Sequence, residues 1–162
     1  MSRQFWIFLV VGIAVVGLLI SGIWFGSKSA HLELNGNILK IRVLALGGKA
    51  SLVVADFRVT NPSGVNFVVS NLSLRLTPAT GDPIEGVPAS RGDVERVFAA
   101  QKLIGPHFND VLGLRDPIPP RQTLDRMTAA RFELPETAIH QRKGISLRLE
   151  DVDGTMAELT EK

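Results

Sequence analysis

The 162-residue chain contains no cysteine and no tyrosine, and aromatic residues make up only 6% of it. Without thiols the chain has no disulfide, thiolate zinc site, iron–sulfur cluster or cysteine nucleophile. The few phenylalanines beyond the N-terminal region recur at strand spacing, which is typical of a core and not of a stacking platform for bases. The composition therefore argues against nucleic acid as a partner.

Charge is absent from one long stretch and nearly balanced elsewhere. Arg3 is the only charged residue before Lys28, so the rest of the chain holds 17 of the 18 basic residues and all 16 acidic ones. The sequence pI of about 9.3 reflects this small surplus. A small surplus does not make a basic face, so it gives no reason to expect nucleic-acid binding.

The uncharged stretch, Phe5–Phe25, predicts a transmembrane helix. Its 21 residues would span roughly 30 Å as a helix, the thickness of the hydrocarbon core of a bilayer. Trp6 and Trp24 lie near its two ends, where indole rings prefer the headgroup level. A cleaved signal peptide is the alternative, but its apolar region is usually shorter. We therefore expect an uncleaved single-pass anchor with the lipid bilayer as its partner.

The expected organisation follows from this anchor. An N-terminal tail (1–4) precedes the anchor (5–25), and a linker (26–30) leads to a domain at 31–153 and an acidic tail at 154–162. Arg3 and the free amino group favour a cytoplasmic N-terminus, although Lys28, Lys40 and Arg42 nearly balance them on the other side. The domain is then expected on the extracytoplasmic side, periplasmic or extracellular.

Beyond residue 30 apolar and polar residues alternate with the period of β-strands. Asn35-Gly36-Asn37 predicts a hairpin turn between residues 31–34 and 38–46. Residues 53–59 predict a strand with one buried face. In residues 65–77 the apolar positions change parity, which predicts a β-bulge near Ser70-Asn71.

Later segments predict further strands and short helices. Residues 126–134 and 145–152 alternate as strands do, and residues 135–143 between them predict a short helix. The tail from residue 154 is expected to fray, with a final edge strand at 156–159 as the alternative.

A helical insertion interrupts this pattern. Ser90 and Asp93 form a capping-box-like start, and Gly105-Pro106 ends the helix. Phe108, Val111 and Leu112 predict one more helical turn. The sequence therefore predicts an all-β fold, an immunoglobulin/fibronectin-like β-sandwich with a short helical insertion, after one N-terminal transmembrane helix.

One stretch carries a family resemblance. Asp56-Phe57-Arg58-Val59-Thr60-Asn61-Pro62-Ser63 and the strand after it resemble the late-embryogenesis-abundant group 2 (LEA type 2) family, which includes the WHy (water stress and hypersensitive response) domain. Asn61 and Pro62 match the Asn-Pro dipeptide of that family, a structural turn after a strand. The resemblance implies a membrane-anchored sandwich without enzymatic activity and with either a stress (desiccation)-protective role or a binding role at the membrane surface. The long segment 90–114 departs from the family pattern.

The residues give little support for catalysis. His31, His107 and His140 belong to no metal-binding motif, and no cofactor or metal site is expected. A pocket that paired His107 with Asp110 or Asp116 would favour an enzyme instead.

Three functions remain open. The first is a non-catalytic sandwich that binds or protects at the membrane surface. The second is an accessory subunit of an envelope assembly that docks through segment 90–120, and the third is a carrier of apolar ligands or lipids. The candidate docking residues share apolar side chains within the helical insertion: Phe98, Leu103, Ile104, Phe108 and Leu112.

Overall fold

A computed structural model describes residues 12–13, 15–17 and 34–161, which fall into two separate units. Residues 12–13 and 15–17 are helical. No helix within the described residues is both long and apolar enough to cross a membrane. Most of the predicted anchor, the linker at 26–30 and His31 lie outside the described residues, so the transmembrane helix stays a prediction.

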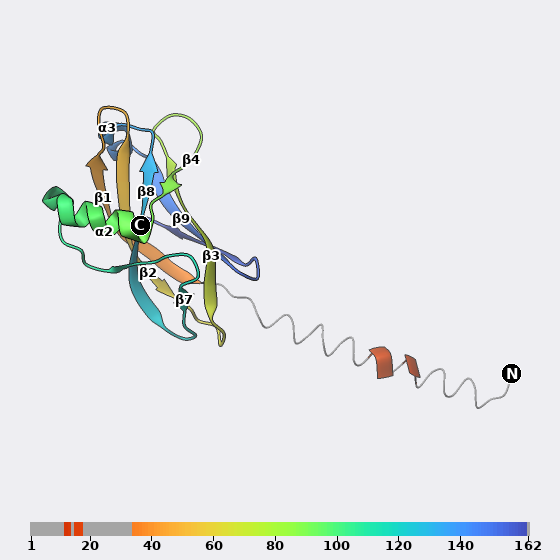
Figure 1. The fold of residues 1–162 in the computed structure, drawn as a ribbon. Coiled ribbons are helices and arrows are strands. Elements are labelled where there is room, and N and C mark those ends of the chain that lie inside the picture. Colours follow the sequence, from red (N-terminus) through yellow and green to blue (C-terminus); the bar gives the residue numbers. More distant parts are fainter. Residues whose placement is uncertain (1–11, 14, 18–33, 162) are drawn as a thin grey trace, which may run out of the picture. The chain divides into compact units, whose positions relative to one another are not determined.

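Residues 34–161 form two β-sheets (Figure 1). The first sheet has the order β1-β2-β8-β5, and a further strand, β6, pairs in parallel with β8. Its strands are β1 (Asn35–Ala45), β2 (Ser51–Thr60), β5 (Val87–Pro88), β6 (Asp110–Val111) and β8 (Thr123–Phe132).

The second sheet has the order β10-β9-β3-β4, and β7 pairs with β3. Its strands are β3 (Phe67–Thr77), β4 (Ile84–Glu85), β7 (Pro117–Ile118), β9 (Gly144–Asp151) and β10 (Met156–Thr160). Two α-helices, α2 (Arg91–Ala100) and α3 (Glu136–His140), and a 3₁₀ turn, η1 (Lys102–Ile104), lie in the connections. The predicted β-sandwich with a helical insertion is confirmed.

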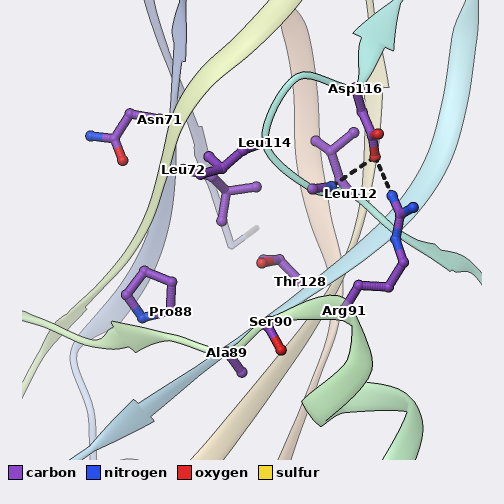
Figure 2. Close-up of a pocket in the computed structure, with 11 residues that line it drawn as sticks. Asn71, Leu72, Pro88, Ala89, Ser90, Arg91, Leu112, Leu114, Asp116 and Thr128 are labelled. Carbon is purple, nitrogen blue, oxygen red and sulfur yellow. Dashed lines mark hydrogen bonds and ion pairs between the residues drawn. The ribbon is translucent and has the colours of Figure 1, made fainter.

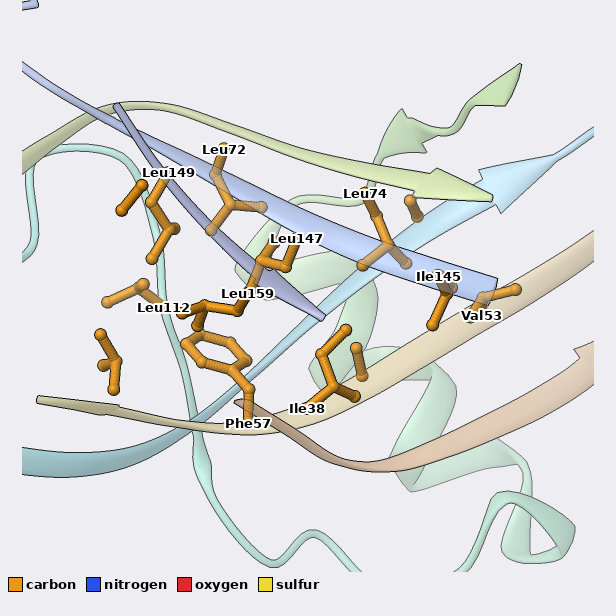
Figure 3. Packing of buried hydrophobic residues seen from close by; sticks show 14 of the residues in the cluster. Ile38, Val53, Phe57, Leu72, Leu74, Leu112, Ile145, Leu147, Leu149 and Leu159 are labelled. Carbon is orange, nitrogen blue, oxygen red and sulfur yellow. The ribbon is translucent and has the colours of Figure 1, made fainter. Parts of the chain in front are cut away.

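The main core lies between the two sheets. Phe57 of β2, Leu74 of β3 and Leu147 of β9 come together there with less than 2% of each side chain exposed (Figure 3). Each belongs to a series of alternate apolar positions along its strand, because successive side chains of a strand point to opposite faces. Burial of these positions is the main source of stability of the sandwich.

A second apolar cluster lies on the other face of the first sheet. Leu52 and Val54 of β2 pack there with Val94 of α2 and Met127 of β8. The prediction that residues 53–59 bury only one face was therefore wrong. The helical insertion covers the face that the alternation had assigned to solvent.

Both sheets contain a β-bulge. The one predicted near Ser70-Asn71 is confirmed by a register shift in the pairing of β3 with β9. A second shift, between Ile38 and Lys40 of β1, was not predicted.

The predicted hairpin at Asn35-Gly36-Asn37 is wrong, because these residues begin the continuous strand β1. Gly36 pairs with Val59, and a Cβ atom at position 36 would overlap the carbonyl oxygen of Arg58. Glycine therefore permits a close approach of two strands here. The asparagines on either side of it had suggested a turn instead.

Replacing Gly36 by alanine is expected to lower the free energy of unfolding by about 1–3 kcal/mol, because β1 must move away from β2. Gly48, in the turn after β1, is the matched control, since a Cβ atom added there would meet no other atom within 4 Å. Urea unfolding of the full chain, followed by far-ultraviolet circular dichroism, measures the free energy of unfolding of both variants, Gly36→Ala and Gly48→Ala. Equal effects of the two substitutions would contradict the close approach.

Two further predictions were wrong. Residues 108–112 form no helical turn, since Asp110 and Val111 pair with β8 as strand β6. The tail expected to fray from residue 154 instead contains β10, in which Leu159 is 1% exposed. The alternative of a final edge strand is therefore the one observed, because alternate residues of this short strand complete the core.

Candidate functional site

The Asn61-Pro62 dipeptide lies in the connection between β2 and β3. Asn61 is fully buried, and its Nδ2 atom donates hydrogen bonds to the carbonyl oxygens of Val65 (2.8 Å) and Ile118 (2.9 Å). Its Oδ1 atom accepts a hydrogen bond from the backbone N–H of Ser63 (3.0 Å). This side chain replaces backbone pairing in the turn, so Asn61 stabilises the fold from a buried position, whereas Pro62 beside it is exposed.

Residues 89–112, which we term the cover segment, pack on the outer face of the first sheet. Ser90 caps α2 by accepting a hydrogen bond from the backbone N–H of Asp93, as the sequence predicted. The Ser90 hydroxyl also donates to the Asp93 carboxylate (2.6 Å). This hydrogen bond holds the pKa of Asp93 below its usual range.

A buried ion pair fastens the cover segment to the sheet. Arg42 of β1 and Asp56 of β2 are 8% and 3% exposed, and Nη2 of Arg42 lies 2.8 Å from Oδ2 of Asp56. The Nη1 atom of Arg42 donates to the carbonyl oxygens of Ile104 (3.2 Å) and Pro106 (2.8 Å). Asn109 donates to the other carboxylate oxygen of Asp56 (3.1 Å). Both charged groups therefore depend on contacts with the cover segment.

The candidate docking residues divide into buried and exposed ones. Ile104 and Leu112 are each 3% exposed and belong to the two cores, and Phe98 is partly buried against the second core. Leu103 is 91% exposed and Phe108 is 60% exposed. We term these two residues the cover tip. The predicted docking surface thus reduces to this tip, and its other members stabilise the fold.

Positive charge lies beside the cover tip. The Nζ atom of Lys40 is 5.5 Å from the centroid of the Phe108 ring, and the guanidinium carbon of Arg42 is 5.7 Å from it. Lys102 precedes Leu103 in η1 and is exposed. Apolar side chains and cations therefore occur together at this point of the surface.

A polar pocket of about 570 Å³ lies beside the first turns of α2. It is lined by His107, Asp110 and Asp116 among others. These are the three residues whose pairing would favour an enzyme. All three line the same pocket. Whether they could act as an acid and base pair depends on the hydrogen bonds and ion pairs that each side chain makes.

Two acids of the polar pocket, Asp116 and Asp110, lie close to arginines. Asp116 accepts hydrogen bonds from Nη2 of Arg91 (2.5 Å) and from the backbone N–H of Gly113 (2.8 Å). Asp110 lies 3.9 Å from Nη1 of Arg126. His107 packs edge-on against Phe98, with 5.1 Å between ring centroids. None of the ion pairs and hydrogen bonds among residues 34–161 joins His107 to a carboxylate.

The described residues contain no group of three or more His, Asp or Glu side chains placed to hold a metal ion.

An exposed ion pair links two strands of the first sheet. Arg58 of β2 donates two hydrogen bonds of 2.7 Å to Asp125 of β8. These bonds hold the pKa of Asp125 below its usual range and raise the pKa of Arg58. The pair fixes the register of two neighbouring strands.

An apolar pocket of about 520 Å³ opens next to the start of α2 (Figure 2). Leu72 of β3, Leu112 and Leu114 line it together with Thr128 of β8. Leu72 and Leu112 also belong to the main core, so this pocket reaches the space between the sheets. The Arg91–Asp116 ion pair forms one wall (Figure 2).

Sequence reasoning missed several of these residues. Arg42 and Asp56 stand among apolar residues of predicted strands, and a charged residue in a strand is normally expected to face solvent. A charge that shares strand parity with apolar neighbours, as Asp56 does with Leu52 and Val54, is the signal that indicates a second covered face.

No family model matches the chain, and no curated protein matches it. Among solved structures, an uncharacterized beta-sandwich protein from Clostridium difficile 630 is 12% identical, with a TM-score of 0.40. The match covers 80% of this chain and 85% of that one. We therefore infer the function of the chain from its own geometry.

Proposed function

We propose that the chain is a membrane-anchored, non-catalytic β-sandwich that binds the membrane surface through its cover tip. The observation that carries this proposal is the exposure of Leu103 and Phe108 beside Lys40 and Lys102. Apolar side chains flanked by lysines suit the boundary of a bilayer, where the apolar groups enter the lipid and the cations meet anionic headgroups.

The way in which the tip is held supports the proposal. The buried Arg42–Asp56 pair and its hydrogen bonds to Ile104 and Pro106 fix the backbone between the two residues of the tip. A fixed backbone keeps Leu103 in water, because the side chain cannot turn inward. A fixed apolar tip loses little conformational freedom on binding, which favours association.

The polar pocket supports a non-catalytic role. A general acid or base needs a titratable group within hydrogen-bond reach of the reacting atoms, and it is commonly oriented by a partner. Asp116 already accepts hydrogen bonds from Arg91 and Gly113, and His107 rests against Phe98. Of these contacts, the one between Arg91 and Asp116 attaches the cover segment to the chain that follows it.

Site-directed spin labelling of the full chain in vesicles that contain anionic phospholipid tests the proposal. The chain has no native cysteine, so Leu103→Cys introduces a single labelling site. We expect a nitroxide at position 103 to collide more often with oxygen, which concentrates in lipid, than with a water-soluble nickel chelate.

Val152, exposed in the turn between β9 and β10, provides the control Val152→Cys. A nitroxide there should show the opposite preference, for the water-soluble chelate. If the labels at 103 and 152 behave alike, the tip does not contact the bilayer, and a protein partner becomes the better explanation of its exposure.

A further inference from the structure

The apolar pocket lies where both sheets lack an edge strand. On β3, β7 pairs with Phe67 and Val68, and β4 pairs with Arg75 and Leu76, which leaves Leu72 in the interval. On β8, β6 pairs with Arg126 and Met127, and β5 pairs with Ala130 and Arg131. Thr128 is in that second interval. Backbone hydrogen bonds from Leu112 to Met127 and from Ala89 to Ala129 confine the gap on β8 to Thr128. Both gaps border the same pocket.

The lining of the pocket combines apolar walls with one free hydroxyl. Leu72, Leu112 and Leu114 supply apolar surface, and Pro88 and Ala89 close the lower side in the view of Figure 2. Thr128 is 3% exposed, and its hydroxyl is directed into the open space between Leu72 and Pro88 (Figure 2). It has no hydrogen-bond partner among residues 34–161. Because this hydroxyl faces the pocket, an oxygen atom of a ligand there would accept its hydrogen bond.

The charges at the rim are already matched. Arg91 donates to Asp116 at 2.5 Å and to the carbonyl oxygen of Val111 at 3.0 Å. Arg91 and Asp116 are the charged residues that line the pocket. Since they pair with each other, a charged headgroup would find no unpaired partner among the lining residues, and a neutral ligand fits better.

We propose that this pocket binds an acyl chain that carries a neutral carbonyl head, such as an ester. The chain would lie against Leu72, Leu112 and Leu114, and the carbonyl oxygen would accept a hydrogen bond from the Thr128 hydroxyl. The volume of about 520 Å³ falls within the range of small-molecule sites, which are mostly apolar with few polar groups. The inference rests on the proposed function, since a membrane-anchored domain meets acyl esters in the bilayer beside it.

Photolabelling of the full chain in vesicles tests this site. The probe is a monoacylglycerol with a diazirine in its acyl chain, and a second arm uses the corresponding free fatty acid. After illumination, mass spectrometry of the digested chain locates the adducts. We expect adducts from the ester at residues 71–72 and 112–114, and at least fivefold fewer there from the fatty acid, whose charge is unmatched.

Two variants separate the apolar cavity from the hydroxyl. Leu114→Trp should fill the pocket and lower the adducts there at least fivefold; Leu114 is 64% exposed, so the fold should tolerate the change. Thr128→Val should lower the ester adducts about three- to tenfold, the effect of one hydrogen bond. Val152→Trp, in an exposed turn, should change nothing, and circular dichroism confirms that each variant folds.

The outcomes distinguish this inference from the proposed function. Adducts within residues 5–25 but none at the pocket would overturn the acyl site and leave the anchored sandwich standing. Adducts at the pocket that survive Leu114→Trp, or equal labelling by ester and fatty acid, would also overturn the site as described. A chain with no adducts within residues 5–25 would contradict the membrane anchor itself.

Discussion

Replacing Asp56 by alanine is expected to lower the free energy of unfolding by about 3–5 kcal/mol. The substitution leaves the Arg42 guanidinium buried without its counter-ion, and an uncompensated buried charge is costly. Arg42 is 8% exposed, and its Nε atom has no hydrogen-bond partner among the described residues. The remaining hydrogen bonds of Arg42, to Ile104 and Pro106, do not neutralise its charge.

The loss should also loosen the cover segment. Asn109 donates to Asp56, so this end of the segment loses a contact together with the ion pair. We expect faster amide hydrogen exchange in residues 101–109 of Asp56→Ala than of the native chain. Exchange in β3 and β9 should change less, because they belong to the other sheet.

Asp125→Ala is the matched control for this prediction. Asp125 also pairs with an arginine of a neighbouring strand, Arg58, but both side chains are more than one-third exposed. Solvent screens such a pair, so its removal should cost far less. Urea unfolding followed by circular dichroism measures both variants. Equal losses for Asp56→Ala and Asp125→Ala would contradict the role assigned to the buried pair.

Replacing Phe57 by alanine is expected to cost about 3–5 kcal/mol as well, through a cavity in the main core. The Phe57 side chain is fully buried and packs among side chains from both sheets, including Ile38 and Leu159 (Figure 3). The strand that carries Phe57, β2, is paired on both sides, with β1 and β8, so the site cannot collapse fully into the space left by the ring. The loss should therefore approach that of other large buried aromatic residues.

Phe108→Ala makes the same chemical change at an exposed position. Phe108 is 60% exposed, so its truncation removes little buried surface and should have a small effect on unfolding. The same variant should weaken contact of the tip with lipid. A loss of stability for Phe108→Ala as large as that for Phe57→Ala would show that the tip is part of the core.

Local signals in the sequence predicted much of the fold correctly. The parity change around Ser70-Asn71 predicted the bulge, because a slip of one residue moves every side chain to the other face. Ser90 and Asp93 predicted the start of α2, because the cap depends on residues three positions apart. Both features are set by neighbours in the chain, so a single sequence suffices to find them.

Features that depend on distant segments were missed or misjudged. Asp56 is buried only because residues 101–109, some fifty positions later, fold over it. Gly36 was assigned to a turn, but the position needs glycine because the backbone of Arg58, on another strand, leaves no room for a Cβ atom. Nothing in the sequence next to Gly36 shows this contact. The apolar pocket likewise arises where β3 and β8 each lack a neighbouring strand. Strand pairing depends on segments far apart in the sequence, so it cannot be predicted from any single segment.

The membrane anchor is the claim on which the account depends most, and tryptophan fluorescence tests it most directly. The chain has two tryptophans, Trp6 and Trp24, and both belong to the predicted anchor. Their emission therefore reports on residues 5–25 alone. In vesicles, brominated phospholipids should quench this emission strongly, and the water-soluble quencher iodide should have little effect. Strong quenching by iodide with none by the brominated lipids would place these residues in water and contradict the account.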